Sequence, residues 1–215
     1  MTGSKMRRRI SMAFLLAGIL GVGVWTWSIV RGAIFQRSAD RIFDDQTSIA
    51  PQRPASPSPP EPGALIGRLA IPRLHLHAIV LEGTDSRTLD VALGHVPGTA
   101  LPGHFGNVAI AGHRDTLFRC LRNISKGDLI VLQTTESSYT YSVENTAIVK
   151  PQDISVLAPA SKFKITLVTC YPFNFIGRAP DRFIVQACLL PKQPAEPGPI
   201  ARPLLTREEV NRPTP

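Results

Sequence analysis

Residues 164–190 read KITLVTCYPFNFIGRAPDRFIVQACLL. Two apolar runs rich in β-branched residues, 164–169 and 182–190, flank a loop with Pro, Asn and Gly, which is the pattern of two strands and a connection. If these strands pair antiparallel, the end of the first lies beside the start of the second. Cys170 and Arg182 then become cross-strand neighbours.

Short apolar runs of the same kind extend back to residue 64. Further strands are expected at 65–71, 76–82, 107–112, 128–134 and 138–149, and short helical turns at 86–94, 116–122 and 153–157. Enrichment in Val, Ile, Thr and Tyr, with Gly, Pro, Asn and Asp between the runs, favours an all-β barrel or sandwich over βαβ units. We therefore predict one domain over 64–190, an antiparallel barrel with a few short helices in its loops.

The segments outside this domain differ from it in charge and in proline. The 215 residues include 24 Lys and Arg against 16 Asp and Glu, and residues 1–9 hold four of the bases and no acid. Half of the net charge of +8 is therefore an N-terminal cluster, which argues against a nucleic-acid-binding surface. Residues 31–63 are expected to form a Pro-rich extracytoplasmic linker whose first part, 31–50, is a candidate short helix. Residues 191–215 are expected to be a disordered Pro-rich tail.

Residues 10–30 form a run of 21 residues without a charge. A helix of that length spans the roughly 30 Å hydrocarbon core of a bilayer. Trp25 and Trp27 fall near one end of the run and the basic residues 1–9 precede the other, so we expect a single-pass cell-membrane anchor with a cytoplasmic N-terminus and an extracytoplasmic domain. The alternative is a cleaved signal peptide, whose apolar stretch is usually shorter, about 7–15 residues.

The candidate chemistry centres on a cysteine at a strand end. Cys170 is positioned there to reach solvent, whereas Cys120 and Cys188 are expected to pack, and an odd number of cysteines leaves at least one free thiol. His113 ends another expected strand, and an imidazole can favour a thiolate and later donate a proton. Arg182 could carry negative charge that develops on a carbonyl oxygen. Each residue alone also fits a structural role.

Taken together, TLVTC at 166–170, GNVAIAGHRD at 106–115 and Arg182 resemble the sortases, membrane-anchored cysteine transpeptidases. The residues that match the family signature are Thr166, Leu167, Thr169, Cys170, Arg182 and His113. The longer run TCYPFNFIGRAPDRFIVQA is most similar to class D sortases. The resemblance covers about 66–190 and implies a closed, eight-stranded sortase β-barrel.

The resemblance also implies a mechanism. The Cys170 thiolate attacks an LPxTG-like sorting signal on a secreted or surface protein and forms a thioacyl-enzyme, His113 transfers protons and Arg182 steadies the oxyanion. The acyl group then passes to an amine of lipid II, of a peptidoglycan stem peptide or of a pilin lysine. Other residues expected to contact the substrate are Thr169, Pro172 and Phe173.

Two other functions are left open by the residues, a hydrolytic cysteine protease on the cell surface and a non-catalytic β-barrel binding module. Transfer to an added amine separates a transpeptidase from a protease, and fast alkylation of Cys170 separates both from a binding module. No cofactor or metal is expected. The three cysteines are 50 and 18 residues apart without a CxxC or HxxxH pair, and no acidic cluster has the spacing of a calcium loop.

Overall fold

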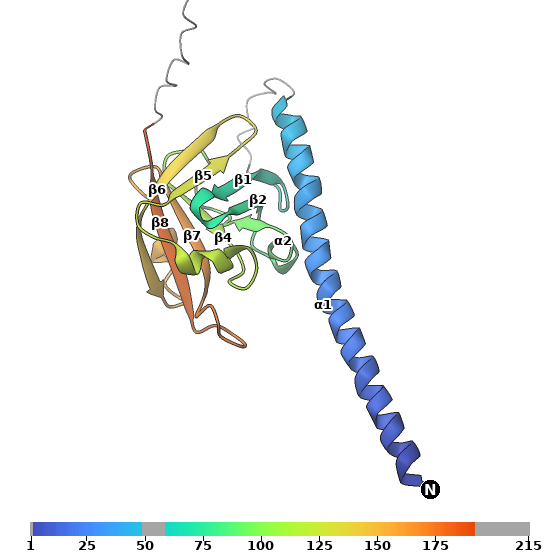
Figure 1. Cartoon of the computed structure of the whole chain (residues 1–215). Coiled ribbons are helices and arrows are strands. Elements are labelled where there is room, and N and C mark those ends of the chain that lie inside the picture. The colour runs from blue at the N-terminus through green and yellow to red at the C-terminus, as the bar shows by residue number, and fades with distance from the viewer. Residues whose placement is uncertain (1, 49–58, 192–215) are drawn as a thin grey trace, which may run out of the picture.

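The computed structural model describes residues 2–48 and 59–191, which form a long helix beside a β-barrel (Figure 1). Helix α1 spans Thr2–Ser48. Its C-terminal part lies along the barrel, and its N-terminal part projects beyond it. The Pro-rich segment 51–58 and the tail from 192 onward lie outside the described residues, so the expectations for them stay predictions.

Eight strands close into one barrel in the order β1-β2-β3-β4-β7-β8-β6-β5. Their bounds are β1 Leu65–Ile71, β2 Leu76–Glu82, β3 Leu93–His95, β4 Asn107–Ala111, β5 Leu129–Gln133, β6 Ser138–Val149, β7 Lys164–Tyr171 and β8 Asp181–Leu189. This confirms the expected closed, all-β barrel of eight strands. Each of the seven strands expected from apolar runs is present, within two residues at either end.

The expectation of a purely antiparallel barrel is wrong at two places. Strands β2 and β3 pair parallel, and so do β4 and β7. A parallel pair requires a crossover connection, and both crossovers exist: the first contains α2, Ser86–Leu89, and the second contains strands β5 and β6. The second parallel pair matters for function, because it makes β4 and β7 end at the same rim.

The helical segments of the barrel are short. Besides α2, they are η1 Pro72–Leu74, η2 Leu117–Asn123 and η3 Ile154–Leu157. Asp85 caps α2 by accepting hydrogen bonds from the backbone N–H groups of Arg87 and Thr88, at 2.9 and 3.3 Å. The turn expected over 86–94 ends early because its last two residues pair in β3, where Gly94 lies too close to the Gly83 carbonyl for any side chain.

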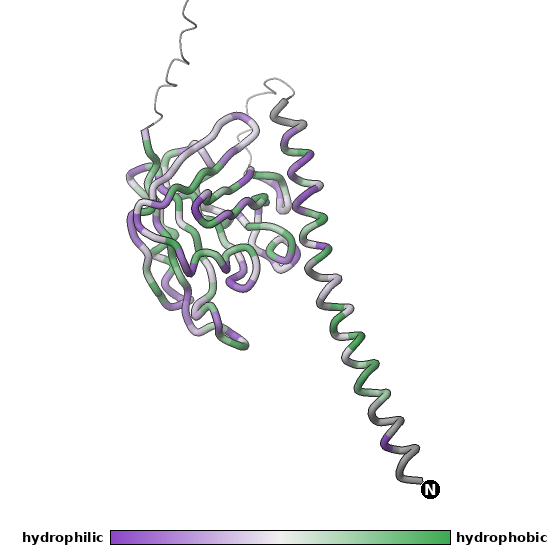
Figure 2. Tube along the Cα trace, in the orientation of Figure 1, coloured by the Kyte–Doolittle hydropathy of each residue, from purple (hydrophilic) through white to green (hydrophobic). Residues whose placement is uncertain are grey.

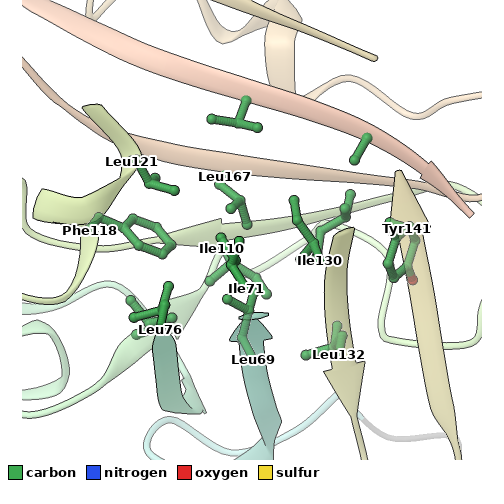
Figure 3. Packing of buried hydrophobic residues seen from close by; sticks show 14 of the residues in the cluster. Leu69, Ile71, Leu76, Ile110, Phe118, Leu121, Ile130, Leu132, Tyr141 and Leu167 are labelled. Carbon is green, nitrogen blue, oxygen red and sulfur yellow. The ribbon is translucent and has the colours of Figure 1, made fainter. Parts of the chain in front are cut away.

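The barrel core is built from alternate residues of the strands (Figure 3). Successive side chains of a strand point to opposite faces, so one face of each strand fills the interior. In β7 this face carries Ile165 and Leu167, which are fully buried. Around them pack Leu69, Ile71, Ile110, Phe118, Leu121, Ile130, Leu132 and Tyr141. By the same period, Thr169 shares the inner face and Cys170 falls on the other.

The C-terminal part of α1 docks onto the outside of the barrel. Residues 31–48 belong to α1, so the candidate helix at 31–50 is present over these residues. The expected linker therefore does not begin at residue 31. The Arg68 side chain of β1 donates hydrogen bonds to Asp40 and Asp44, at 2.9 and 2.8 Å, and its guanidinium lies 4.7 Å from the centre of the buried Phe43 ring.

Within 2–48 and 59–191, no helix combines the length and the apolar character needed to cross a membrane. The anchor expected at 10–30 is therefore not confirmed and stays a prediction.

Candidate active site

Cys170 and Arg182 face each other across a strand pair. Strands β7 and β8 pair antiparallel, and their register places Cys170 opposite Arg182. This is the juxtaposition that the two flanking runs of the hairpin predicted. Both side chains are half-buried, so each reaches the surface of the barrel wall.

His113 arrives at the same rim by way of the parallel strand on the other side of β7. Ala111 pairs with Val168, and the next residue, Gly112, donates its N–H to the Val168 carbonyl at 3.1 Å. Counting two residues beyond the Ala111–Val168 pair gives His113 on one strand and Cys170 on the other. A glycine fits at position 112 because a Cβ there would lie 2.7 Å from the Leu93 side chain and 2.8 Å from the Phe118 ring, both of which are fully buried.

The three side chains open into one cavity of about 810 Å³. Its remaining lining residues are Arg114, Asp115, Lys150, Pro151, Gln152, Gly177, Arg178, Ala179 and Pro180. The His113 side chain is 42% exposed, and its Nε2 lies 4.0 Å from a carboxylate oxygen of Asp90. A thiol, an imidazole and a guanidinium thus share a space that is open to solvent and large enough for part of a peptide.

Arg182 keeps its positive charge uncompensated at this site. Its Nη1 donates to the backbone carbonyls of Asp181 and Ala179, at 3.0 and 3.5 Å. The Asp181 carboxylate turns instead to Lys150, 2.7 Å away. Among the described residues no carboxylate forms an ion pair with Arg182, which leaves the guanidinium able to attract negative charge that develops near Cys170.

The residues expected to contact the substrate lie in or next to the wall of the barrel. Thr169 is 2% exposed, and its hydroxyl donates to the Gly112 carbonyl at 2.8 Å, so it ties the end of β7 to the end of β4. Phe173 packs against the core and against the rings of Tyr171 and Phe183, with centroids 6.0 and 5.4 Å away. Pro172 follows a cis peptide bond. Neither these aromatic rings nor Pro172 line the cavity, and their part in substrate binding stays a prediction.

Arg114 is a residue of this site that the sequence did not single out. Its Nη2 donates to the carbonyls of Phe175 and Gly177, at 2.7 and 2.9 Å, and its guanidinium lies 5.9 Å from the centre of the Phe175 ring. The loop that carries His113 is thereby fastened to the loop that follows Cys170. The position next to His113 is the only sequence signal, because the partners are backbone carbonyls 61 and 63 residues away.

The other two cysteines are set apart from this chemistry. Cys120, Cys170 and Cys188 are all free thiols. Burial raises the pKa of Cys120, whose Sγ donates to the Leu117 carbonyl at 3.4 Å. Burial, and then the neighbouring Glu144, raise the pKa of Cys188. Across the described part of the chain, no three His, Cys, Asp or Glu side chains gather in an arrangement that could hold a metal ion.

The comparison with protein families matches the sortase domain to residues 69–190 of this chain. The chain belongs to the sortase family. Sortases are cysteine transpeptidases, typically of the cell surface, and the resemblance seen in the TLVTC and GNVAIAGHRD segments is thereby confirmed.

Individual sortases are similar over much of the chain. Sortase D of Bacillus subtilis is 36% identical over 127 residues, covering 59% of this chain and 64% of its own length. Sortase SrtE1 of Streptomyces coelicolor is 31% identical over 216 residues, covering 89% of this chain and 59% of its own length. The chain thus spans less than two thirds of the length of either relative.

Solved sortases share the fold. The Sortase D5 transpeptidase of Clostridium perfringens has a TM-score of 0.59 and 25% identity, covering 74% of this chain and 98% of that chain. The SrtA sortase from Actinomyces oris has a TM-score of 0.56 and 32% identity, covering 65% of this chain and 88% of that chain. The class D resemblance of the sequence is consistent with both Sortase D relatives.

Proposed function

We propose that this sortase cleaves an LPxTG-like sorting signal through Cys170 and transfers the acyl group to an amine. The observation that carries the proposal is the convergence of Cys170, His113 and Arg182 on one cavity, from the adjacent ends of β4, β7 and β8. Nucleophile, proton donor and oxyanion stabiliser are the three groups that thiol-dependent acyl transfer requires.

In the first half-reaction the Cys170 thiolate attacks the carbonyl carbon of the scissile Thr–Gly-type bond. A C–S bond forms, and the developing oxyanion is stabilised by the Arg182 guanidinium. The C–N bond then breaks as the His113 imidazolium gives its proton to the departing amine. The products are a thioacyl-enzyme, a free amine fragment and a neutral imidazole.

In the second half-reaction an incoming amine attacks the thioacyl carbonyl and gives its proton to His113. The C–S bond breaks, an amide forms, and the thiolate and imidazolium are restored. Acceptors in this proposal are lipid II, a peptidoglycan stem peptide or a pilin lysine. Water in place of the amine would give hydrolysis, the outcome of the protease alternative, and the same three residues would serve it.

Anchoring in a membrane is part of the proposal. Its support is a group of exposed apolar side chains on the part of α1 that projects beyond the barrel and is coloured mainly as hydrophobic in Figure 2: Met12, Phe14, Leu15, Leu16, Ile19, Leu20, Val22, Val24 and Trp27. Exposure of such a continuous apolar surface to water is unfavourable, and four basic residues precede it within 1–9. The barrel would then lie outside the membrane, close to its surface.

The test is intact-mass spectrometry of the full-length protein in detergent with LPxTG-, LPxTA- and LAxTG-like peptides, with and without an amine acceptor. We expect an acyl adduct on Cys170 without the acceptor and a ligated peptide with it. The Cys170→Ala variant gives neither product. Acid product alone, even at high amine concentration, would favour the protease. An inert Cys170 that also resists alkylation would favour the binding module.

A further inference from the structure

The cavity beside Cys170 has an excess of positive charge that the chemistry of acyl transfer does not explain. Its lining includes the cations Arg114, Lys150, Arg178 and Arg182 together with His113, whereas Asp115 is the single carboxylate among its lining residues. An LPxTG-type signal presents an uncharged backbone and neutral side chains at its fixed positions. One guanidinium, Arg182, is enough to stabilise the oxyanion, so the other cations have no assigned partner in the reaction.

The individual environments of these cations show which of them are available. Lys150 forms an ion pair with Asp181 at 2.7 Å, so its charge is largely compensated. Arg178 is exposed and has no side-chain hydrogen bond or ion pair to any described residue. Arg114 contacts only backbone carbonyls through Nη2, which leave its charge in place, and its Nη1 is buried without a hydrogen-bond partner.

The exposed, unpaired guanidinium of Arg178 shares one cavity wall with Arg114, whose charge no carboxylate of the described residues compensates, and this wall is suited to an anion. Guanidinium groups bind carboxylates with paired hydrogen bonds, and each such contact gains from the charge of both partners. The rest of the wall, formed by Pro151, Ala179 and Pro180, contributes no negative charge. Complementarity therefore points to a negatively charged group that sits within reach of His113 and Cys170.

We propose that this cavity is a carboxylate-binding subsite, in which Arg178 binds a carboxylate of one of the two peptidic reactants and Arg114 adds to the positive charge of the wall. The inference rests on the proposed transpeptidase function and adds the chemical class that the site selects. The carboxylate can come from the acyl acceptor, next to its attacking amine, or from an acidic residue of the sorting signal. The two sources share one chemistry and are separated by the experiment.

The experiment measures initial rates of ligation by mass spectrometry on the full-length protein, in two arms. In the acceptor arm the donor is a capped LPQTG peptide, and diaminopimelic acid is compared with its diamide. In the donor arm the acceptor is triglycine amide, and capped LPETG is compared with LPQTG. We expect the carboxylate form to have a kcat/KM about three- to tenfold higher in one arm, in line with a partly exposed ion pair. The arm with the preference identifies the source.

Variants assign the preference to the cavity. Arg178→Gln is expected to reduce the carboxylate-to-amide ratio to near one, and Arg178→Glu to invert it. The control is Arg122→Gln, which removes the same charge from an exposed arginine lining a separate hollow beside η1 and η2, and which should keep the wild-type ratio. Raising the salt from 0.05 to 0.5 M should diminish the ratio in the wild type, because exposed charges are screened.

The outcomes keep this inference apart from the proposed function. A thioacyl adduct with LPQTG together with equal rates for acid and amide in both arms would overturn the subsite and leave the transpeptidase intact. A preference that survives Arg178→Gln unchanged would also overturn it. The absence of any adduct with either peptide would count against the proposed function itself.

Discussion

At the scale of single residues, the cysteines are distinguished by their surroundings. Burial raises the pKa of Cys120 and of Cys188, so at pH 7.5 both are mostly thiols and poor nucleophiles. Cys170 opens into a cavity that is accessible from the surface, beside a histidine and an arginine. A thiol reagent offered in limited amount should therefore react at one position first.

We predict that iodoacetamide at pH 7.5 alkylates Cys170 at least tenfold faster than Cys120 or Cys188. Peptide mapping after short incubations measures the three rates. Raising the pH towards 9.5 should narrow the difference between the alkylation rates, since a growing fraction of the Cys120 and Cys188 thiols then ionises. Equal labelling of all three thiols at pH 7.5 would contradict the prediction.

Arg182 is the second residue whose role can be measured alone. Arg182→Ala should lower kcat for transpeptidation by about 10²–10³-fold, the usual cost of removing one oxyanion donor. The melting temperature should change little, because the guanidinium donates only to carbonyls at the loop end. Cys188→Ala serves as the control that changes another β8 residue outside the cavity and keeps kcat. A loss of less than threefold in Arg182→Ala would exclude the oxyanion role.

At the scale of elements, Arg114 connects the loop after β4 to the loop after β7. We predict that Arg114→Gln speeds hydrogen exchange of the Phe175 amide, which donates to the Pro172 carbonyl at 3.4 Å, by about tenfold or more, because bonds from a charged donor contribute roughly 1.5–3 kcal/mol each. Arg114→Lys should not restore slow exchange, since an ammonium cannot reproduce the fork that reaches Phe175 and Gly177. Unchanged exchange in Arg114→Gln would show that the loop is held by other contacts.

A second element-level prediction concerns the ion pair between η1 and the start of β5. Asp128 accepts hydrogen bonds from Arg73 and from the Ser125 N–H at 2.8 Å, and the bond from Arg73 holds the pKa of its carboxyl below the usual value. A lowered folded-state pKa gives stability that is present above the unfolded value, about 3.9, and is lost as the pH falls through the folded value.

Asp128→Asn should therefore lower the melting temperature at pH 7 by about 2–4 °C. The difference from the wild type should begin to shrink as the pH falls below about 4, because the unfolded wild type then binds a proton at Asp128, and it should vanish once the pH passes the lowered pKa of the folded carboxyl. Thermal unfolding followed by circular dichroism between pH 3 and 7 tests this, with the exposed Asp153→Asn as control. A difference that stays constant down to pH 3 would contradict the role of the charge.

The elements also show what the sequence could predict. Strand positions were predictable because alternation and β-branched composition act locally, and Cys170 met Arg182 because one loop joins their strands. Strand direction across the parallel pairs depends on crossover connections, a short one through α2 and a long one through β5 and β6, and the pattern of a single strand does not record them, so the antiparallel expectation failed there. Strand β3 has three residues, too few for any periodicity. Arg114 binds carbonyls, which leave no trace in side-chain patterns.

At the scale of the whole molecule, α1 completes the barrel at the point where β3 is too short. Strand β3 pairs with β2 only from Val80 onward, so the N–H of Ile79 has no strand partner on that side. The Gln36 amide oxygen of α1 accepts this N–H at 2.9 Å, and its Nε2 donates to the Val91 carbonyl at 2.6 Å. One helical side chain thus replaces a missing pair of sheet hydrogen bonds.

We predict that Gln36→Leu lowers the free energy of unfolding by about 1–3 kcal/mol, because it leaves the N–H of the buried Ile79 without an acceptor. Chemical denaturation of the full-length protein in detergent measures the change, and the exposed Arg37→Ala on the same helix is the control. The variant also removes the hydrogen bond to the Val91 carbonyl, so hydrogen exchange over 89–91 should become faster. This segment adjoins the site, because the Asp90 carboxylate lies 4.0 Å from His113. Full stability and unchanged exchange in Gln36→Leu would mean that α1 only rests against the barrel. Lower stability together with faster exchange would make the helix a structural part of the wall that carries His113.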